Sequence, residues 1–183
     1  MRAVEGDDGD LLKKLLAEGA DPNAVDKDGN TLLMIAIREG KNNAVKVLLA
    51  AKAKVNARNR LGDTALMLAA MEGRTAIAKQ LVFNGAQVDF KGWNPLLYAA
   101  FGGKDEVVVM LLDLGANING TAPNGATPLM LAVRGGYKAT VELLLKKGAN
   151  PNLKTDRGET ALTWAKDREH AEIGKLLLES GAK

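Results

Sequence analysis

The chain has 183 residues and a formal net charge of only +3, which is too small a charge to indicate binding to nucleic acid or to a membrane surface. It contains no cysteine, so disulfides, thiolate catalysis and cysteine-ligated metals are excluded. No apolar run approaches the roughly 18 residues needed to span a membrane. We expect neither a metal ion nor a cofactor.

The chain begins with a short segment that is expected to be incomplete. Ala3 falls in register with Ala36 and Ala69 of the later sequence, which places residue 3 midway through a helix. The present N-terminus is not a secretory signal, because no apolar segment follows Met1. Because the chain begins midway through a first helix, we expect Met1 to replace a removed segment, either a signal peptide or an earlier part of the protein. The location is then cytoplasmic by default, and periplasmic if a signal peptide has been cleaved.

From residue 19 onward the sequence repeats itself with a period close to 33 residues. A Gly-x-Thr-x-Leu pattern, with Asn94 replacing threonine in one copy, begins at residues 29, 62, 92, 125 and 158, at spacings of 33, 30, 33 and 33. A Gly-Ala pair, with Lys52 replacing glycine in one copy, begins at residues 19, 52, 85, 115, 148 and 181. Both patterns lose three residues once and in the same region, so the chain is an array of repeated units.

Each repeat is predicted to contain two short helices. The threonine of the first pattern lies where an N-cap hydroxyl accepts a hydrogen bond from a free helix amide, and Pro95 and Pro128 follow at the first helical position. The second helix carries apolar residues at helical spacing and ends at the Gly-Ala pair. The segment after it is expected to lead outward as a β-hairpin finger. Small residues are expected to let neighbouring helices approach closely; they are the alanines at 36, 69, 99, 132 and 165.

The period near 33 and the Thr127-Pro128-Leu129 element resemble the ankyrin repeat. The resemblance covers essentially the whole chain and implies an all-α solenoid of stacked helix-turn-helix repeats with β-hairpin fingers, one of them three residues short. The implied parts of this single domain are 1–25 (an N-terminal half repeat), 26–58, 59–88, 89–121, 122–154 and 155–183 (a C-terminal cap). The histidine that follows Thr-Pro-Leu in this family is replaced by Met34, Met67, Leu97, Met130 and Thr163. This replacement removes a hydrogen bond that often ties adjacent repeats.

Two groups of residues could carry chemistry, and a structural role is the preferred interpretation of both. His170 is the only histidine, and without cysteine it cannot form a zinc site of nitrogen and sulfur ligands. Asp7, Asp8 and Asp10 form the densest acidic cluster, but the bidentate glutamate of a calcium-binding loop is missing at the required spacing. We expect an aspartate of this cluster to cap the helix that begins at Leu11. No catalytic residue is predicted.

The main functional signal lies where the repeats differ from one another. The resemblance implies that a partner binds the finger tips and the exposed side of the first helices, which form a concave face. Five of the seven aromatic residues fall between Phe83 and Phe101, where three residues are also missing, so we expect a notch in that face. Aromatic residues flanked by arginine are typical of binding hot spots. The predicted partner-binding residues are Arg58, Arg60, Leu61, Met71, Phe90, Lys91, Trp93, Phe101 and Arg134.

Local packing is the alternative for several of these aromatic residues. In that interpretation Phe90 and Trp93 fold inward and fill the gap left by the missing residues. Phe83 and Tyr98 are expected to pack against neighbouring helices in either case, because their register faces them.

We expect a monomeric, non-enzymatic module that binds one partner protein, and neither nucleic acid nor a membrane. Its simplest mechanism is occlusion, in which it inhibits or sequesters a partner enzyme, as in self-protection or immunity. The style of the repeats, rich in methionine and leucine, is typical of bacterial members of the family. The alternative hypothesis is a structural or scaffolding fragment of a longer ankyrin protein, since the first helix is expected to be incomplete. Further repeats or a catalytic domain upstream would favour that alternative.

Overall fold

The computed structural model describes residues 2–183, so Met1, at which a truncated beginning is expected, lies outside the described residues. Helices make up the regular structure of this part of the chain. In chain order they are α1 (Arg2–Glu5), α2 (Gly9–Ala17), α3 (Leu32–Arg38), α4 (Asn42–Ala50), α5 (Ala65–Met71), α6 (Thr75–Phe83), α7 (Pro95–Phe101), α8 (Asp105–Asp113), α9 (Pro128–Gly135), α10 (Lys138–Lys146), α11 (Ala161–Asp167) and α12 (Ala171–Glu179).

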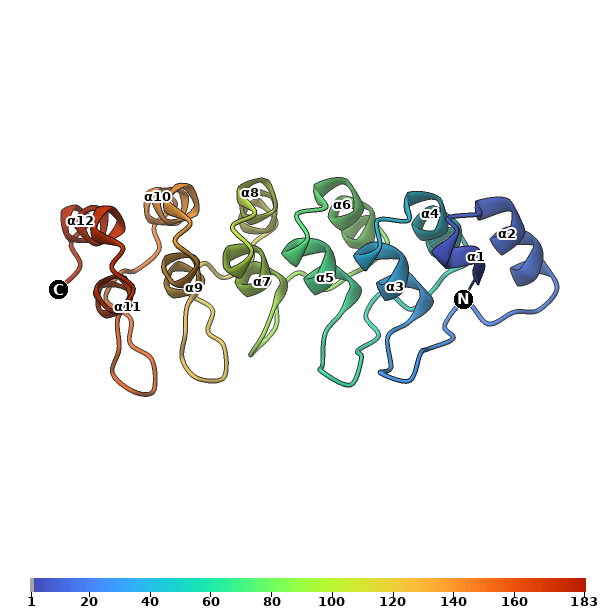
Figure 1. Ribbon diagram of the computed structural model, residues 1–183, viewed down its shortest axis with the longest axis horizontal. Helices are drawn as coiled ribbons and strands as arrows, with labels where there is room; N and C mark the ends of the chain where they lie inside the picture. Colours follow the sequence, from blue (N-terminus) through green and yellow to red (C-terminus); the bar gives the residue numbers. More distant parts are fainter. Residues whose placement is uncertain (1) are drawn as a thin grey trace. The chain divides into compact units, whose positions relative to one another are not determined.

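The chain divides into two compact units. The first comprises the residues up to Ala69 together with Arg74–Gln87, and the second comprises Ala70–Gly73 together with Val88–Lys183. In the first unit α3 packs on α4, and α4 contacts both α2 and α6. In the second unit α7, α9 and α11 lie side by side in one row, while α8, α10 and α12 form another row (Figure 1). Each unit therefore consists of helix pairs stacked in sequence order, as a repeat array requires.

The predicted N-caps are confirmed. Thr127 Oγ1 accepts a hydrogen bond from the amide of Met130, and Pro128 occupies the first position of α9. Thr31, Thr64 and Thr160 cap α3, α5 and α11 in the same way. In α7 the cap is Asn94, whose side-chain oxygen accepts from the amide of Leu97. Each such cap is worth about 1 kcal/mol, because it satisfies an amide that has no partner within the helix.

The residue that replaces the family's histidine completes several of these caps. The amides of Thr64 and Thr127 donate to the sulfur atoms of Met67 and Met130, and the amide of Thr160 donates to Thr163 Oγ1 at 2.7 Å. Sulfur is a weak acceptor, so the methionine caps are weaker than the one formed by threonine. In these three repeats the first turn of the helix is therefore braced although the histidine is missing.

The predicted small residues of the first helices are confirmed as core residues. Their alanines, at positions 36, 69, 99, 132 and 165, are all almost completely buried, as is Ala3 in α1. A methyl side chain at these positions lets adjacent first helices approach closely, and larger apolar residues fill the space between the two rows of helices. The largest fully buried ones include Leu33, Ile37, Leu96 and Leu129.

The fingers are hairpin loops closed by recurring main-chain hydrogen bonds, one of which runs from the turn glycine, as from the amide of Gly125 to the carbonyl of Ala122. The amide of Ala122 donates to the carbonyl of Ala126, and the same bond joins residues 26 and 30, 59 and 63, and 155 and 159. Among residues 2–183 the only pairing of β type outside helices is an isolated bridge between Val25 and Thr31, so the predicted β-hairpins do not extend into strands. Consecutive fingers within the second unit are linked, since the amide of Asp156 donates to the carbonyl of Asn124 at 3.1 Å.

The finger that leads into α7 is shorter than the others of the second unit, as the missing residues predict (Figure 1). A side chain closes this loop: Asn94 Nδ2 donates to Asp89 Oδ1 at 3.2 Å and to the carbonyl of Phe90 at 3.4 Å. The other carboxylate oxygen of Asp89 accepts from the amide of Asn117. The short finger is thereby held in place although the loop has lost three residues.

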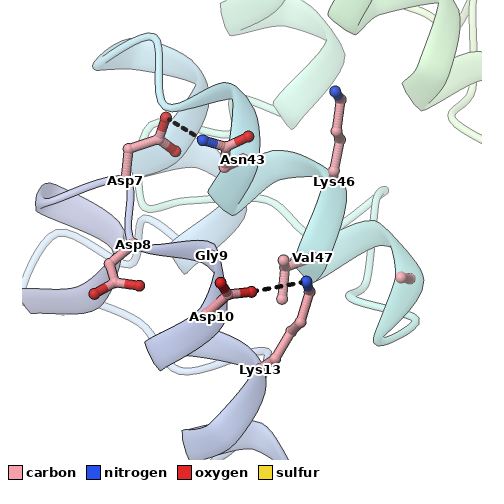
Figure 2. A pocket seen from close by; sticks show the side chains of 9 residues that line it. Asp7, Asp8, Gly9, Asp10, Lys13, Asn43, Lys46 and Val47 are labelled. Carbon is pink, nitrogen blue, oxygen red and sulfur yellow. Dashed lines mark hydrogen bonds and ion pairs between the residues drawn. The ribbon is translucent and has the colours of Figure 1, made fainter.

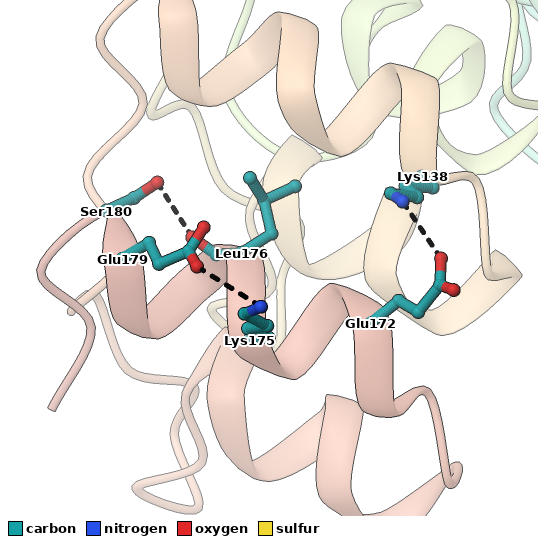
Figure 3. Close-up of polar contacts among 6 residues, drawn as sticks. All are labelled: Lys138, Glu172, Lys175, Leu176, Glu179 and Ser180. Carbon is teal, nitrogen blue, oxygen red and sulfur yellow. Dashed lines mark hydrogen bonds and ion pairs between the residues drawn. The ribbon is translucent and has the colours of Figure 1, made fainter.

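Charged side chains join α10 and α12 on the surface of the second unit. Lys138 Nζ lies 2.9 Å from Glu172 Oε2 (Figure 3). The hydrogen bond and the charge of Lys138 lower the pKa of Glu172, and Glu172 raises the pKa of Lys138 for the same two reasons. Because both side chains are exposed, this pair stabilises the fold only slightly and is weakened by salt.

Candidate functional site

A groove in the second unit is lined by residues at the carboxyl ends of consecutive first helices. It has a volume of about 480 Å³. The residues that line it are Met71, Glu72, Phe101, Gly102, Lys104, Arg134, Gly135, Tyr137 and Arg168. Met71, Phe101 and Arg134 occupy the same position in three successive repeats, two residues before the glycine that separates the helices. The repeat period therefore brings them into one row.

Two repeats carry glycine in the groove where others carry a charged side chain. Gly102 and Gly135 occupy the position that is Glu72 and Arg168 in the repeats on either side. A Cβ atom on Gly102 would lie 2.7 Å from the main-chain oxygen of Met71, so the neighbouring helix end approaches too closely for any other residue. The glycines therefore allow neighbouring groups to approach closely, and the larger side chains on either side form the rim.

The ring of Tyr137 lies in a slot made of glycine. A Cβ atom on Gly103 would lie 2.6 Å from Tyr137 Cδ1 and Cγ, and one on Gly135 would clash with the other edge of the same ring. Real Cβ atoms do not approach other heavy atoms this closely, so the ring position depends on both glycines. Tyr137 remains 39% exposed, which leaves part of the ring available to a ligand.

Arg134 stacks on Phe101 at the centre of the groove. Its guanidinium carbon lies 6.0 Å from the centroid of the Phe101 ring, and Phe101 is 37% exposed. A cation–π contact of this kind contributes about 0.5–1 kcal/mol at an exposed site. Among residues 2–183 this guanidinium has no ion-pair or hydrogen-bond partner, so its N–H groups can bind a planar acceptor.

The cationic groups of the groove lack partners within the protein. In the part of the chain from residue 2 to 183, neither Arg134 nor Arg168 forms an ion pair or a side-chain hydrogen bond. Both side chains are exposed. Three cationic side chains therefore face the groove (Lys104, Arg134 and Arg168), against the single carboxylate of Glu72. The groove favours a negatively charged ligand.

A second hollow shares the two arginines. It has a volume of about 530 Å³ and is lined by Arg134, Glu159, Trp164, Asp167 and Arg168. Trp164 Nε1 donates to Glu159 Oε2 at 3.0 Å, which occupies that carboxylate and fixes the indole ring. Arg134 and Arg168 thus have aromatic surface on both sides, with Phe101 and Tyr137 in one hollow and Trp164 in the other.

The structure brings together three of the nine predicted partner-binding residues, namely Met71, Phe101 and Arg134. Phe90, Lys91 and Trp93 lie on the short finger of the same unit. Trp93 is 40% exposed and meets Tyr98 edge to face, with ring centroids 5.6 Å apart, so it is neither fully buried nor part of the groove.

The remaining three predicted residues, Arg58, Arg60 and Leu61, belong to a finger of the first unit. Leu61 is 86% exposed, whereas Arg58 Nη1 donates to the carbonyl of Gly62 at 2.7 Å and helps to close the loop. The expectation for Phe83 is wrong: it is 91% exposed at the end of α6 and packs against no neighbouring helix. Phe83 is the last residue of α6, and its side chain points into solvent.

Sequence reasoning did not assign Glu72, Lys104, Tyr137 and Arg168 to the site. The available signal was the double glycine at 102–103 and 135–136, because the other repeats have a single glycine or none at these positions. These glycines let the Met71 carbonyl and the Tyr137 ring lie close to the helix ends.

The acidic cluster near the amino terminus is used for structure. It borders a hollow of about 610 Å³ in the first unit (Figure 2). Asp8 accepts from the amide of Leu11, which confirms the predicted cap. Asp7 accepts from the amide of Ala44 and from Asn43 Nδ2 at the start of α4, and Asp10 pairs with Lys13 at 3.1 Å. Each of the three carboxylates thus has a partner within the protein.

Within residues 2–183, His170 and the helices indicate neither a metal site nor a membrane-spanning segment. The His170 imidazole packs where a Cβ atom of Gly136 would lie, which agrees with a structural role at the start of α12. Across residues 2–183, no three histidine, aspartate or glutamate side chains are grouped so that they could hold a metal ion. None of the described helices combines the length and the apolar character needed to cross a bilayer.

Comparison with known proteins identifies the fold. A family model described as ankyrin repeats in three copies matches residues 1–91, 52–122, 80–155 and 96–183, which together span the chain. The structure is similar to the crystal structure of an ankyrin repeat domain from Acinetobacter baumannii AYE, with 36% sequence identity and a TM-score of 0.85, covering 100% of this chain and 97% of that one. No curated protein matches the sequence. The predicted all-α solenoid of ankyrin repeats is confirmed.

Proposed function

This chain belongs to the ankyrin repeat family, a family of general protein–protein interaction modules, and we propose that it is a non-enzymatic module that binds one partner protein at the groove of the second unit. The partner is held by Met71, Phe101 and Arg134, with Tyr137 and Arg168 beside them. Trp93, Phe90 and Lys91 on the short finger are proposed to extend this contact.

The stacked pair of Phe101 and Arg134, exposed above the groove, carries the proposal. A few residues supply most of the binding energy at protein interfaces, and aromatic and arginine side chains are enriched among them. An exposed apolar surface is unfavourable in water, and its position beside unpaired arginines is typical of an interface.

The proposed consequence of binding is occlusion of the partner. The ankyrin matches span all 183 residues, which supports recognition of a partner as the proposed activity. A rigid module seated on an enzyme blocks the surface that it covers without chemistry of its own. We propose inhibition or sequestration of a partner enzyme, of the kind used in self-protection.

Capture experiments with matched variants test the proposed function. The wild-type chain, Met71→Ala/Phe101→Ala and Phe83→Ala are immobilised and exposed to a lysate of the organism that encodes the protein. Phe83→Ala is the control, because it removes an exposed aromatic ring outside the groove. We expect one partner to be retained by the wild type and by Phe83→Ala and to be lost by the double variant, with circular dichroism showing that all three are folded.

The same proteins separate inhibition from simple binding. If the captured partner is an enzyme, its activity should fall as the wild-type chain or Phe83→Ala is added, and should not fall with Met71→Ala/Phe101→Ala. If all three proteins capture the same partner in equal amounts, the groove is refuted as the binding site. Full activity of a saturated partner enzyme would refute occlusion.

A further inference from the structure

We infer that the groove recognises a segment of the partner in which a single aspartate or glutamate has an apolar neighbour on each side. This inference rests on the proposed function and adds the chemistry of the recognised segment. It follows from three features of the second unit: unpaired arginines, aromatic surface on both sides of them, and interspersed carboxylates.

The arginines select a carboxylate. The guanidinium carbon of Arg134 lies 6.0 Å from the centroid of the Phe101 ring, a contact that restricts this side chain before a ligand arrives. Arg168 lines the same two hollows, and neither guanidinium forms an ion pair or a side-chain hydrogen bond with another described residue. A carboxylate fits the fork of a guanidinium through two parallel hydrogen bonds, which adds directional specificity to the charge attraction.

The two hollows select the apolar neighbours. One of them, at about 480 Å³, offers Met71, Phe101 and Tyr137, and the other, at about 530 Å³, offers the fixed indole of Trp164. Both volumes lie in the range of side-chain and ligand pockets, roughly 300–1,000 Å³. A segment whose carboxylate sits between Arg134 and Arg168 therefore places an apolar side chain in each hollow.

The carboxylates of the site disfavour nucleic acid. Glu72 borders the first hollow, and Asp167 and Glu159 border the second. A polyphosphate chain places a negative charge at every nucleotide and would be repelled at these positions. A peptide with a single carboxylate meets the arginines without this repulsion.

Selection from a phage-displayed library of random dodecapeptides tests the inference. The bait proteins are the full chain, Arg134→Gln/Arg168→Gln, and the control Lys154→Gln/Arg157→Gln, which removes two exposed charges from a finger of the same unit. We expect the wild type and the control to enrich peptides with the apolar–acidic–apolar pattern, and Arg134→Gln/Arg168→Gln to lose this enrichment.

Binding of the best selected peptide then gives the magnitude. By fluorescence anisotropy, each arginine substitution should weaken binding about tenfold, since a hydrogen bond to a charged group typically contributes this much. Replacing the acidic residue of the peptide by its amide should weaken it similarly, and the effect should be smaller when Arg134 and Arg168 are already absent.

Several outcomes overturn the inference. It fails if basic or neutral peptides are enriched, if the acidic pattern persists in Arg134→Gln/Arg168→Gln, or if oligo-dT binds the same arginines as tightly as the peptide. A cellular partner that is lost by Met71→Ala/Phe101→Ala but retained by the arginine variant would leave the proposed function standing and refute only the acidic segment. Acidic enrichment without any cellular partner would support the segment chemistry and count against the proposed function.

Discussion

The glycine slot that holds Tyr137 can be tested by adding one methyl group to Gly103. Gly103 has a φ angle of +64°, and a Cβ atom there would lie 2.6 Å from Tyr137 Cδ1 and Cγ. Gly103→Ala therefore has two costs. The left-handed backbone costs alanine about 1–2 kcal/mol, and overpacking against the ring costs about 1–3 kcal/mol more. We expect the free energy of unfolding to fall by about 2–5 kcal/mol.

Gly115→Ala provides the matched control. Gly115 has a φ angle of +86°, but a Cβ atom there would have no neighbour within 4 Å, so only the backbone cost applies. Urea unfolding followed by circular dichroism would be measured for both alanine variants, for Tyr137→Ala and for Gly103→Ala/Tyr137→Ala. In the absence of the ring, the cost of Gly103→Ala should fall to that of Gly115→Ala.

The result that would refute this reasoning is a cost of Gly103→Ala that is the same with and without the tyrosine ring. The Tyr137 ring would then not be held between Gly103 and Gly135, and the described glycine slot would be wrong. A larger cost only in the presence of the ring would show that the glycine pair positions Tyr137.

Three further predictions concern a cap, an ion pair and the short finger. Thr127→Ala should lower the free energy of unfolding by about 1 kcal/mol and the Tm by about 2–4 °C in thermal unfolding, because α9 loses its cap, whereas Thr127→Ser should retain most of the stability. The stability difference between wild type and Glu172→Gln, measured by urea unfolding across pH, should be constant near neutral pH. It should shrink as the pH falls below the ordinary glutamate range, because Lys138 lowers the pKa of Glu172 and this contribution is lost once the carboxylate is protonated; a difference that grows in acid would contradict the assignment. Trp93→Ala should weaken binding of the captured partner by about 2 kcal/mol in calorimetry, and unchanged affinity would exclude the short finger from the interface.

Local chemistry explains why the helices were predictable. A threonine or asparagine followed by an apolar helix, as at Thr127 or Asn94, specifies the first turn through hydrogen bonds between residues three apart in sequence. Proline at the next position reinforces the same boundary. The buried alanines were predictable for a related reason, since the repeat period places Ala132 and its equivalents on the same side of every first helix.

Local sequence patterns did not predict two features correctly: the extent of the β-hairpins in the fingers and the exposure of Phe83. The recurring hydrogen bonds of a finger lie at its turn, and an extended strand would require further pairs that the sequence period does not specify. Phe83 has the apolar character of a core residue, but it lies on the last turn of α6 and is almost fully exposed. An apolar residue near the end of a helix faces the core only if another element covers that end.

For the candidate site, the sequence by itself determined the repeat, its helix boundaries and the row that contains Met71, Phe101 and Arg134. Tertiary structure alone decided that Tyr137 and Arg168 join this row to form a groove. The position of the Tyr137 ring depends on Gly103 of the preceding repeat and on Gly135, because a Cβ atom on either glycine would clash with the ring. Hydrogen bonds within a turn depend on residues close in sequence, whereas the shape of a groove depends on side-chain volumes about 33 residues apart, which become neighbours only when the repeats stack.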